Sequence, residues 1–173
     1  ADAFLDRDTG RTPVLVLDLD VVAQRYRELR AALPAATAFY AMKANPHPAV
    51  LELLASMGCG VDAASVNELD QSIAHGIPAS MMSYGNPVRR VAEITHAHDL
   101  GVGIFSVDDL DELDKLTRHA PGSRVLGRLN TEGAAAAWPL SRKFGTDVAT
   151  CVQILRRALA NGHTVGATFH VGS

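Results

Sequence analysis

The stretch Thr37–Pro46, TAFYAMKANP, decides the fold of this chain. It joins a short β-rich run, Thr37–Met42, to Lys43 and then to residues that end a strand. Five further β-rich runs follow, and segments of helical period separate them, which is typical of βα units on a parallel sheet. The further runs are Val61–Ala64, Met81–Gly85, Val102–Val107, Arg124–Leu129 and Thr164–Val171.

The spacing of these runs favours a (β/α) barrel of the TIM type. Their starts lie 24, 20, 21, 22 and 40 residues apart, which is close to one strand plus one helix, with an expanded connection before the sixth. A complete barrel has eight strands and about 250 residues, whereas this chain has 173 residues and six such runs. We therefore expect an incomplete (β/α)8 barrel, either because the sequence is a fragment or because a second polypeptide closes it.

Several helix ends can be predicted from residue type. Ser65 and Glu68 have the spacing of a capping box at the start of the helix after the second run. Asp108 is expected to open the helix after the fourth run, and the helix after the fifth is expected to begin near Asp147 and to end at Asn161.

The apolar periodicity predicts which helix faces are buried. In the helix after the fourth run the predicted stripe is Leu110, Leu113 and Leu116, and in the helix after the fifth it is Val148, Val152, Leu155 and Leu159. Before the barrel we expect a strand, Thr12–Leu17, and then a helix whose apolar face carries Val22, Tyr26, Leu29 and Leu33.

Composition and charge exclude several functional classes. The chain is 47% hydrophobic, and 16 basic against 19 acidic residues give a net charge of −3 without a basic cluster. Nucleic-acid binding needs a basic face and a membrane span needs about 20 apolar residues, so we expect neither partner. The acidic, polar start does not resemble a secretory signal, which favours a cytoplasmic protein.

Cys59 and Cys151 are expected to be buried free thiols, and no spacing predicts a metal site.

Lys43 is the most informative candidate for chemistry. In barrel enzymes the active site forms at the carboxyl ends of the strands, and Lys43 follows an apolar strand directly. Partial desolvation there would favour a neutral amine, a nucleophile able to form a Schiff base. The alternative is a strand-end lysine that extends to solvent.

Other polar residues follow the remaining strands and should converge at the same end of the barrel. They are Asp62, Ser65, Tyr84, Asn86, Ser106, Arg128, Asn130, His170 and Ser173. A lone histidine on an apolar strand is more often a core residue, but the small residues Gly172 and Ser173 after His170 would let backbone N–H groups approach an anion. Glu68 either caps its helix or lines the site.

Five motifs together resemble the fold-type III PLP-dependent decarboxylases of basic amino acids, the group of ornithine, lysine, arginine and diaminopimelate decarboxylases. The motifs are YAMKANP, VDAASVNEL, YGNP, WPLSRKFG and TFHVGS, in this order. The resemblance implies that residues 1–18 supply a strand to a separate β-domain and that residues 19–173 form part of a barrel that binds pyridoxal 5'-phosphate (PLP). It also implies a homodimer.

The resemblance assigns roles to individual residues. Lys43 matches the lysine that forms the internal aldimine with PLP, His170 the histidine that stacks on the pyridine ring, and Ser173 a serine near the phosphate. Asp62 and Glu68 match acidic positions that line the cofactor pocket. The family's glycine-rich phosphate loop, pyridine-nitrogen acid, catalytic cysteine and substrate-binding aspartate belong to a portion after Ser173, which a complementing part would have to supply.

The substrate implied by the resemblance is a small basic amino acid, ornithine or lysine, converted to a diamine of the polyamine type. One departure stands out, because Pro139 replaces the arginine of the RLSxKFG pattern of eukaryotic ornithine decarboxylases, and Arg128 or Arg142 would have to replace its guanidinium. Two alternatives stay open: a diaminopimelate decarboxylase or related PLP racemase, and a non-catalytic regulator similar to antizyme inhibitors.

Overall fold

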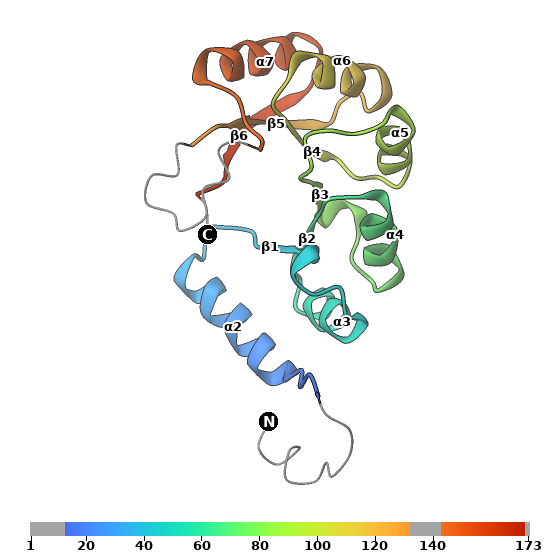
Figure 1. The fold of residues 1–173 in the computed structure, drawn as a ribbon, viewed down its shortest axis with the longest axis vertical. Helices are drawn as coiled ribbons and strands as arrows, with labels where there is room; N and C mark the ends of the chain where they lie inside the picture. Colours follow the sequence, from blue (N-terminus) through green and yellow to red (C-terminus); the bar gives the residue numbers. More distant parts are fainter. Residues whose placement is uncertain (1–12, 132–142, 172–173) are drawn as a thin grey trace.

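The fold is a six-stranded parallel sheet, and all of its helices except the first lie on one side of it (Figure 1). A computed structural model describes residues 13–131 and 143–171. The strands are β1 (Phe39–Ala41), β2 (Gly60–Ala63), β3 (Met82–Tyr84), β4 (Ile104–Val107), β5 (Arg124–Leu129) and β6 (Thr164–Phe169). The α-helices are α2 (Leu19–Ala32), α3 (Pro48–Ser56), α4 (Val66–Ala74), α5 (Val91–Asp99), α6 (Leu110–His119) and α7 (Val148–Ala160), and short 3-10 turns cover Met42–Ala44 and Ala79–Met81.

Each strand from β1 to β5 pairs with the next strand in the chain. The order in the sheet is β1-β2-β3-β4-β5-β6 and all pairs are parallel, beginning with Phe39 opposite Gly60. The strands curve into an arc, and α3 to α7 cover its outer side (Figure 1). The predicted partial α/β barrel is therefore confirmed, and each of the six strands falls within or close to its predicted run.

The main core lies between the strands and the outer helices. Fully buried apolar residues from the first five βα units meet there, and β6 adds only the partly buried Val165. The largest of the fully buried residues include Tyr84, Phe105, Met42, Leu51, Leu113 and Ile154. A smaller cluster of Val50, Leu54 and Cys59 packs against Val22 and Tyr26 of α2. Cys59 and Cys151 are both buried free thiols, as predicted.

The predicted buried face of α7 is wrong. Val148 is 68% exposed and Leu159 57%, and the buried residues are Cys151, Ile154 and Ala158. Both stripes have helical spacing, so periodicity alone could not separate them. The sheet makes the choice, because Gly127 of β5 lies so close to α7 that an added Cβ would stand 2.7 Å from Cys151 Sγ. Such a close approach suits the small Cys151 side chain, and Leu155, the one predicted residue that is half-buried, meets the same glycine.

Of two predictions at the N-terminal end, the strand Thr12–Leu17 stays a prediction, because its expected partner is a separate β-domain, and the buried face of the helix after it needs correction. Residues 13–17 of the predicted strand Thr12–Leu17 pair with nothing in the part of the chain that the structure describes, and Thr12 lies outside it. In α2, Val22 and Tyr26 pack inward as predicted, but Leu29 and Leu33 are exposed because α2 packs mainly against α3.

The helix ends follow residue chemistry with one exception. Ser65 caps α4 by accepting from Glu68 N, and Asp147 caps α7 by accepting from Thr150 N. α6 is capped by Asp109 and not by Asp108. The Asp108 carboxylate instead accepts from Gly145 N at 2.7 Å, which ties the end of β4 to the segment before α7.

Within residues 13–131 and 143–171, no helix has the length and apolar character needed to cross a membrane. The same residues contain no group of three or more histidine, cysteine, aspartate or glutamate side chains placed to hold a metal ion.

Candidate active site

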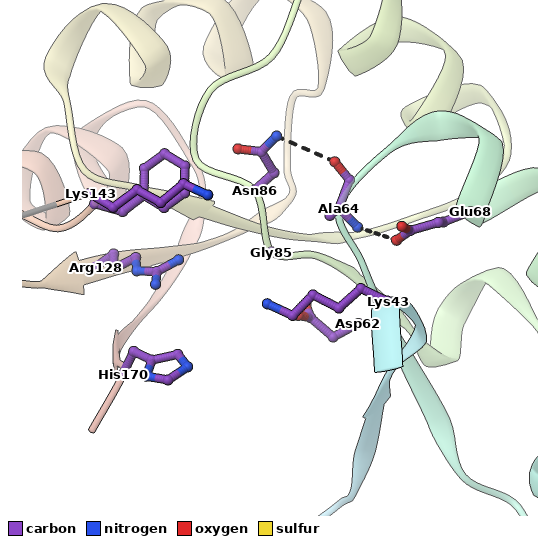
Figure 2. A pocket seen from close by; sticks show the side chains of 10 residues that line it. Lys43, Asp62, Ala64, Glu68, Gly85, Asn86, Arg128, Lys143 and His170 are labelled. Atoms are coloured by element: carbon purple, nitrogen blue, oxygen red, sulfur yellow. Dashed lines mark hydrogen bonds between the residues drawn. The ribbon is translucent and has the colours of Figure 1, made fainter. Parts of the chain in front are cut away.

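A cavity of about 320 Å³ opens at the carboxyl ends of the strands. Its walls come from the turns after β1, β2 and β3 on one side and from β5, β6 and the segment before α7 on the other (Figure 2). The lining residues are Lys43, Asp62, Ala64, Glu68, Gly85, Asn86, Arg128, Lys143, Phe144 and His170. The site therefore stands where a parallel barrel is expected to place it.

Lys43 lies on the 3-10 turn that follows β1, one residue after the fully buried Met42. Tyr40 closes this turn by donating its hydroxyl to Asn45 O at 3.1 Å. The Lys43 side chain points across the cavity toward Arg128 and His170 (Figure 2). Lys43 is exposed within the described residues, so this part of the chain does not desolvate the amine as the strand-end position predicted.

Asp62 is a half-buried acid of the cavity. Its carboxylate accepts from the Ser83 hydroxyl. Burial raises the pKa of Asp62 above its ordinary value, and the Ser83 hydrogen bond and the positive charges of Lys43 and Arg128 lower it by less. The Asp62 carboxyl therefore holds a proton more readily than an exposed aspartate does.

Glu68 lines the cavity, but it does not complete the predicted capping box. Its carboxylate accepts from Ala64 N at 2.6 Å, and the same residue lines the cavity. The capping differs in one detail from a standard capping box, because the side chain reaches the N–H of Ala64 and not that of the N-cap Ser65. Asn86 Nδ2 donates to Ala64 O at 3.3 Å from the neighbouring turn (Figure 2).

The opposite wall is basic and aromatic. The Arg128 guanidinium stands 5.3 Å from the centroid of the Phe144 ring, which is within cation–π range. The segment that carries Phe144 is tied to β5, because Thr146 N donates to Arg128 O at 2.9 Å and Asn130 N donates to Thr146 O at 2.8 Å. His170 follows β6, and its carbonyl accepts from the Thr131 hydroxyl.

The cavity gathers five of the six predicted site residues: Lys43, Asp62, Glu68, Arg128 and His170. Ser173 lies outside the described residues, as do Pro139 and Arg142. Asn86 also lines the cavity, whereas Tyr84 is 1% exposed and belongs to the core. Gly85 and Phe144 were missed as lining residues, although both stand inside motifs that the resemblance used, YGNP and WPLSRKFG.

Comparison with known proteins gives a consistent result. The family model described as "Pyridoxal-dependent decarboxylase, pyridoxal binding domain" matches residues 19–173. The lysine/ornithine decarboxylase of Selenomonas ruminantium is 41% identical over 163 residues, which are 94% of this chain and 42% of that protein. The antizyme inhibitor 2 of Xenopus laevis is 34% identical over 99% of this chain and 36% of its own length.

The fold agrees with these sequence matches. A crystal structure of lysine decarboxylase from Selenomonas ruminantium superimposes with a TM-score of 0.87 at 39% identity and covers 99% of this chain and 45% of the solved one. The chain thus spans less than half the length of the proteins it matches.

Proposed function

We propose that this chain, which belongs to the pyridoxal-dependent decarboxylase family and contains its pyridoxal-binding domain, is the cofactor-binding part of an enzyme that decarboxylates ornithine or lysine to a diamine. The observation that carries the proposal is the convergence of Lys43, His170 and two carboxylates on one cavity at the functional end of the barrel. Because the chain spans 42% of the matched bacterial decarboxylase, the activity is proposed for this chain together with its completing portion.

The residues present fit PLP. Its aldehyde requires an amine, which Lys43 presents on the cavity wall, and its aromatic ring requires a flat partner, for which the His170 imidazole is the candidate. The cationic side chains Arg128 and Lys143 suit an anionic cofactor. The Gly85 position also supports the fit, since a side chain there would displace the Asp62 carboxylate from the cavity wall.

In this mechanism each residue of the chain has a defined task. Lys43 Nζ would hold the cofactor through its aldehyde. The His170 ring supports the cofactor plane, and the Asp62 carboxyl, whose pKa is raised by burial, can hold a proton beside Lys43. Glu68 orients the wall by accepting from Ala64 N. When bound, PLP would supply an electron sink next to the substrate α-carbon.

The partners of the chain follow from its open sheet. Among the described strands, β1 and β6 each pair on one side only. An apolar groove of about 400 Å³ runs beside β1 and is lined by Phe39, Tyr26, Leu29 and neighbouring residues. We propose that the completing portion, in the same polypeptide or in a second chain, covers these surfaces, that residues 1–18 join its β-domain, and that the complete enzyme is a homodimer.

A second candidate is a regulator that binds a partner protein without catalysis. The observation in its favour is the 34% identity to antizyme inhibitor 2 over nearly the whole chain. The two candidates differ in their chemistry, because a regulator would release no CO₂ and form no diamine.

The deciding experiment locates the cofactor bond in the complete protein. After loading with PLP and reduction with borohydride, the pyridoxyl mass is expected on the peptide that carries Lys43. Lys143 lines the same cavity and provides the matched control: Lys43→Arg should abolish the label and Lys143→Arg should retain it. A label on Lys143 or Lys115, or none in the wild type, would overturn the proposal, and product analysis with ornithine, lysine and diaminopimelate would identify the substrate.

A further inference from the structure

Arg89 is a buried cation that lies outside the cavity. Its side chain is 0% exposed. The guanidinium stands 5.3 Å from the centroid of the Tyr84 ring and 5.5 Å from that of Phe105. Removing a guanidinium from water is costly unless its charge and its donors are matched. A buried arginine between two rings therefore has to be explained by what it binds.

The donors of Arg89 bind main-chain carbonyls at the carboxyl ends of two neighbouring strands. Nη1 donates to Tyr84 O at 3.2 Å and to Asn86 O at 2.7 Å, and Nη2 donates to Ser106 O at 2.8 Å. One rigid group thus joins the turn after β3 to the end of β4. Lysine could not reproduce this, because its ammonium is a single point and lacks the planar fork.

Helix α6 supplies the matching charge. Glu112 Oε2 lies 3.9 Å from Arg89 Nη2. Lys115 Nζ donates to Arg89 O at 2.7 Å and pairs with the Glu112 carboxylate. α6 thus places a carboxylate near the guanidinium without a hydrogen bond to it, and it holds the Arg89 carbonyl through Lys115.

The turn that Arg89 holds forms one wall of the candidate active site. Gly85 N donates to Ala63 O at 2.9 Å and Asn86 Nδ2 donates to Ala64 O at 3.3 Å. Ala64 N in turn donates to Glu68 at 2.6 Å. The contacts form a continuous path from the buried guanidinium to the side chains that face the cavity.

We propose that Arg89 is a positioning residue for the cofactor pocket: its guanidinium holds the Gly85–Asn86 turn against β4, and the turn fixes Ala64 and Glu68 at the cavity wall. Arg89 touches neither cofactor nor substrate. The inference rests on the proposed function for its effect on PLP, but the restraint of the turn can be measured without cofactor.

The experiment compares Arg89→Met and Arg89→Lys in the complete protein with Arg90→Met as the matched control. Arg90 is the adjacent residue of the same type, and its side chain is 88% exposed. The first readout is amide hydrogen exchange in the cofactor-free protein at Gly85 and Ala64, with Thr164 at the opposite end of the barrel as the reference. The second readout is the PLP dissociation constant, from a titration of cofactor fluorescence.

Arg89→Met should speed exchange at Gly85 and Ala64 and raise the PLP dissociation constant, each by about tenfold or more, while Thr164 stays within about twofold. Arg89→Lys should give an intermediate effect, and Arg90→Met none.

An equal rise in the exchange rate at all three amides, or a PLP dissociation constant within about twofold of the wild type, would overturn the positioning role. If Arg89→Met does not fold, Arg89→Lys is used, and it should change the two amides and the dissociation constant by more than about twofold while Thr164 does not change. A wild type that binds no PLP would refute the proposed function, while the exchange data would still report whether Arg89 holds the turn.

Discussion

Gly85 and Asp62 stand so close that only a hydrogen atom fits between them. A Cβ built on Gly85 would lie 2.6 Å from Asp62 Oδ2, a distance that real Cβ atoms do not show. Gly85 belongs to the turn after β3 and Asp62 to β2, so the contact sets how closely two neighbouring walls of the cavity approach. A side chain at residue 85 would therefore have to push the Asp62 carboxylate out of its place.

Gly85→Ala should weaken PLP binding by about tenfold or more, because the new methyl group displaces the Asp62 carboxylate. Overpacking of this kind also costs about 1–3 kcal/mol of stability. The dissociation constant of PLP and a urea titration would measure both effects. Gly103→Ala is the matched control, since a Cβ there has no atom within 4 Å. Equal PLP affinity in the two variants would contradict the prediction.

Asp62→Asn should change how stability depends on pH. The folded protein raises the pKa of Asp62 above its ordinary value of 3.8, so it binds this proton more tightly than the unfolded chain does. The Asp62 contribution to stability is therefore fully present below pH 3.8 and is lost as the pH rises through the raised pKa. Asparagine removes this loss and keeps an acceptor for the Ser83 hydroxyl. Compared with the wild type, Asp62→Asn should therefore be more stable at about pH 7 than at about pH 4, as judged by the free energy of unfolding.

Asp147→Asn is the control for this pH dependence, with the opposite sign. Hydrogen bonds from Thr150 lower the pKa of Asp147, so its contribution is present above the ordinary pKa of 3.8 and is lost as the pH falls. Its substitution should be more destabilising at neutral pH than in acid. Urea titrations of the cofactor-free protein at both pH values would check the pair, and the same sign for both variants would contradict the assignment of Asp62 as the desolvated acid.

His170→Ala should lower turnover by about tenfold or more, or about 1.4 kcal/mol in the barrier, because the cofactor plane loses its supporting ring. The measurement is the turnover number of the complete enzyme with ornithine and lysine. His96→Ala provides the control, since His96 lies on α5 and pairs with Asp70 at 2.7 Å, away from the cavity. A variant that retains its turnover would make His170 a structural residue.

Residues 1–173 alone should show neither decarboxylase activity nor a cooperative unfolding transition. β1 and β6 would expose unpaired N–H and C=O groups, and the apolar stripe of Val148, Val152 and Leu159 on α7 is already exposed in the described residues. Adding the completing portion should restore both properties. Circular dichroism during heating and an assay for released CO₂ would test this, and an active, cooperatively folded chain of 173 residues would show the architecture to be misread.

The barrel and most of its candidate site were predictable because both depend on local signals. The alternation of short β-rich runs with helical segments follows from which side chains must be buried, and strand ends identify the functional side of a parallel barrel. Lys43, Asp62 and His170 could therefore be placed together before any distance was known.

Other features could not be predicted because they depend on contacts between distant residues. The buried face of α7 is selected by Gly127 on another element, and Asp108 caps no helix because it accepts from Gly145 N. Arg89 gave no signal at all, since an arginine beside Arg90 is typical of an exposed turn. Its burial depends on the main-chain carbonyls of Tyr84, Asn86 and Ser106 and on the nearby Glu112 carboxylate. These groups lie on β3, on the turn after it, on β4 and on α6.

The strict chain order of the sheet has a consequence for synthesis on the ribosome. Each strand from β2 to β6 pairs with the strand made just before it. The connection between two such strands contains an α-helix and has fewer than about 40 residues, so the contacts are local in sequence. The arc can thus grow one βα unit at a time as the chain emerges, without waiting for distant segments. Among the described strands β1 is made before the other five, and its outer side gains no partner as β2 to β6 are added, so this edge of the growing arc is exposed for the longest time.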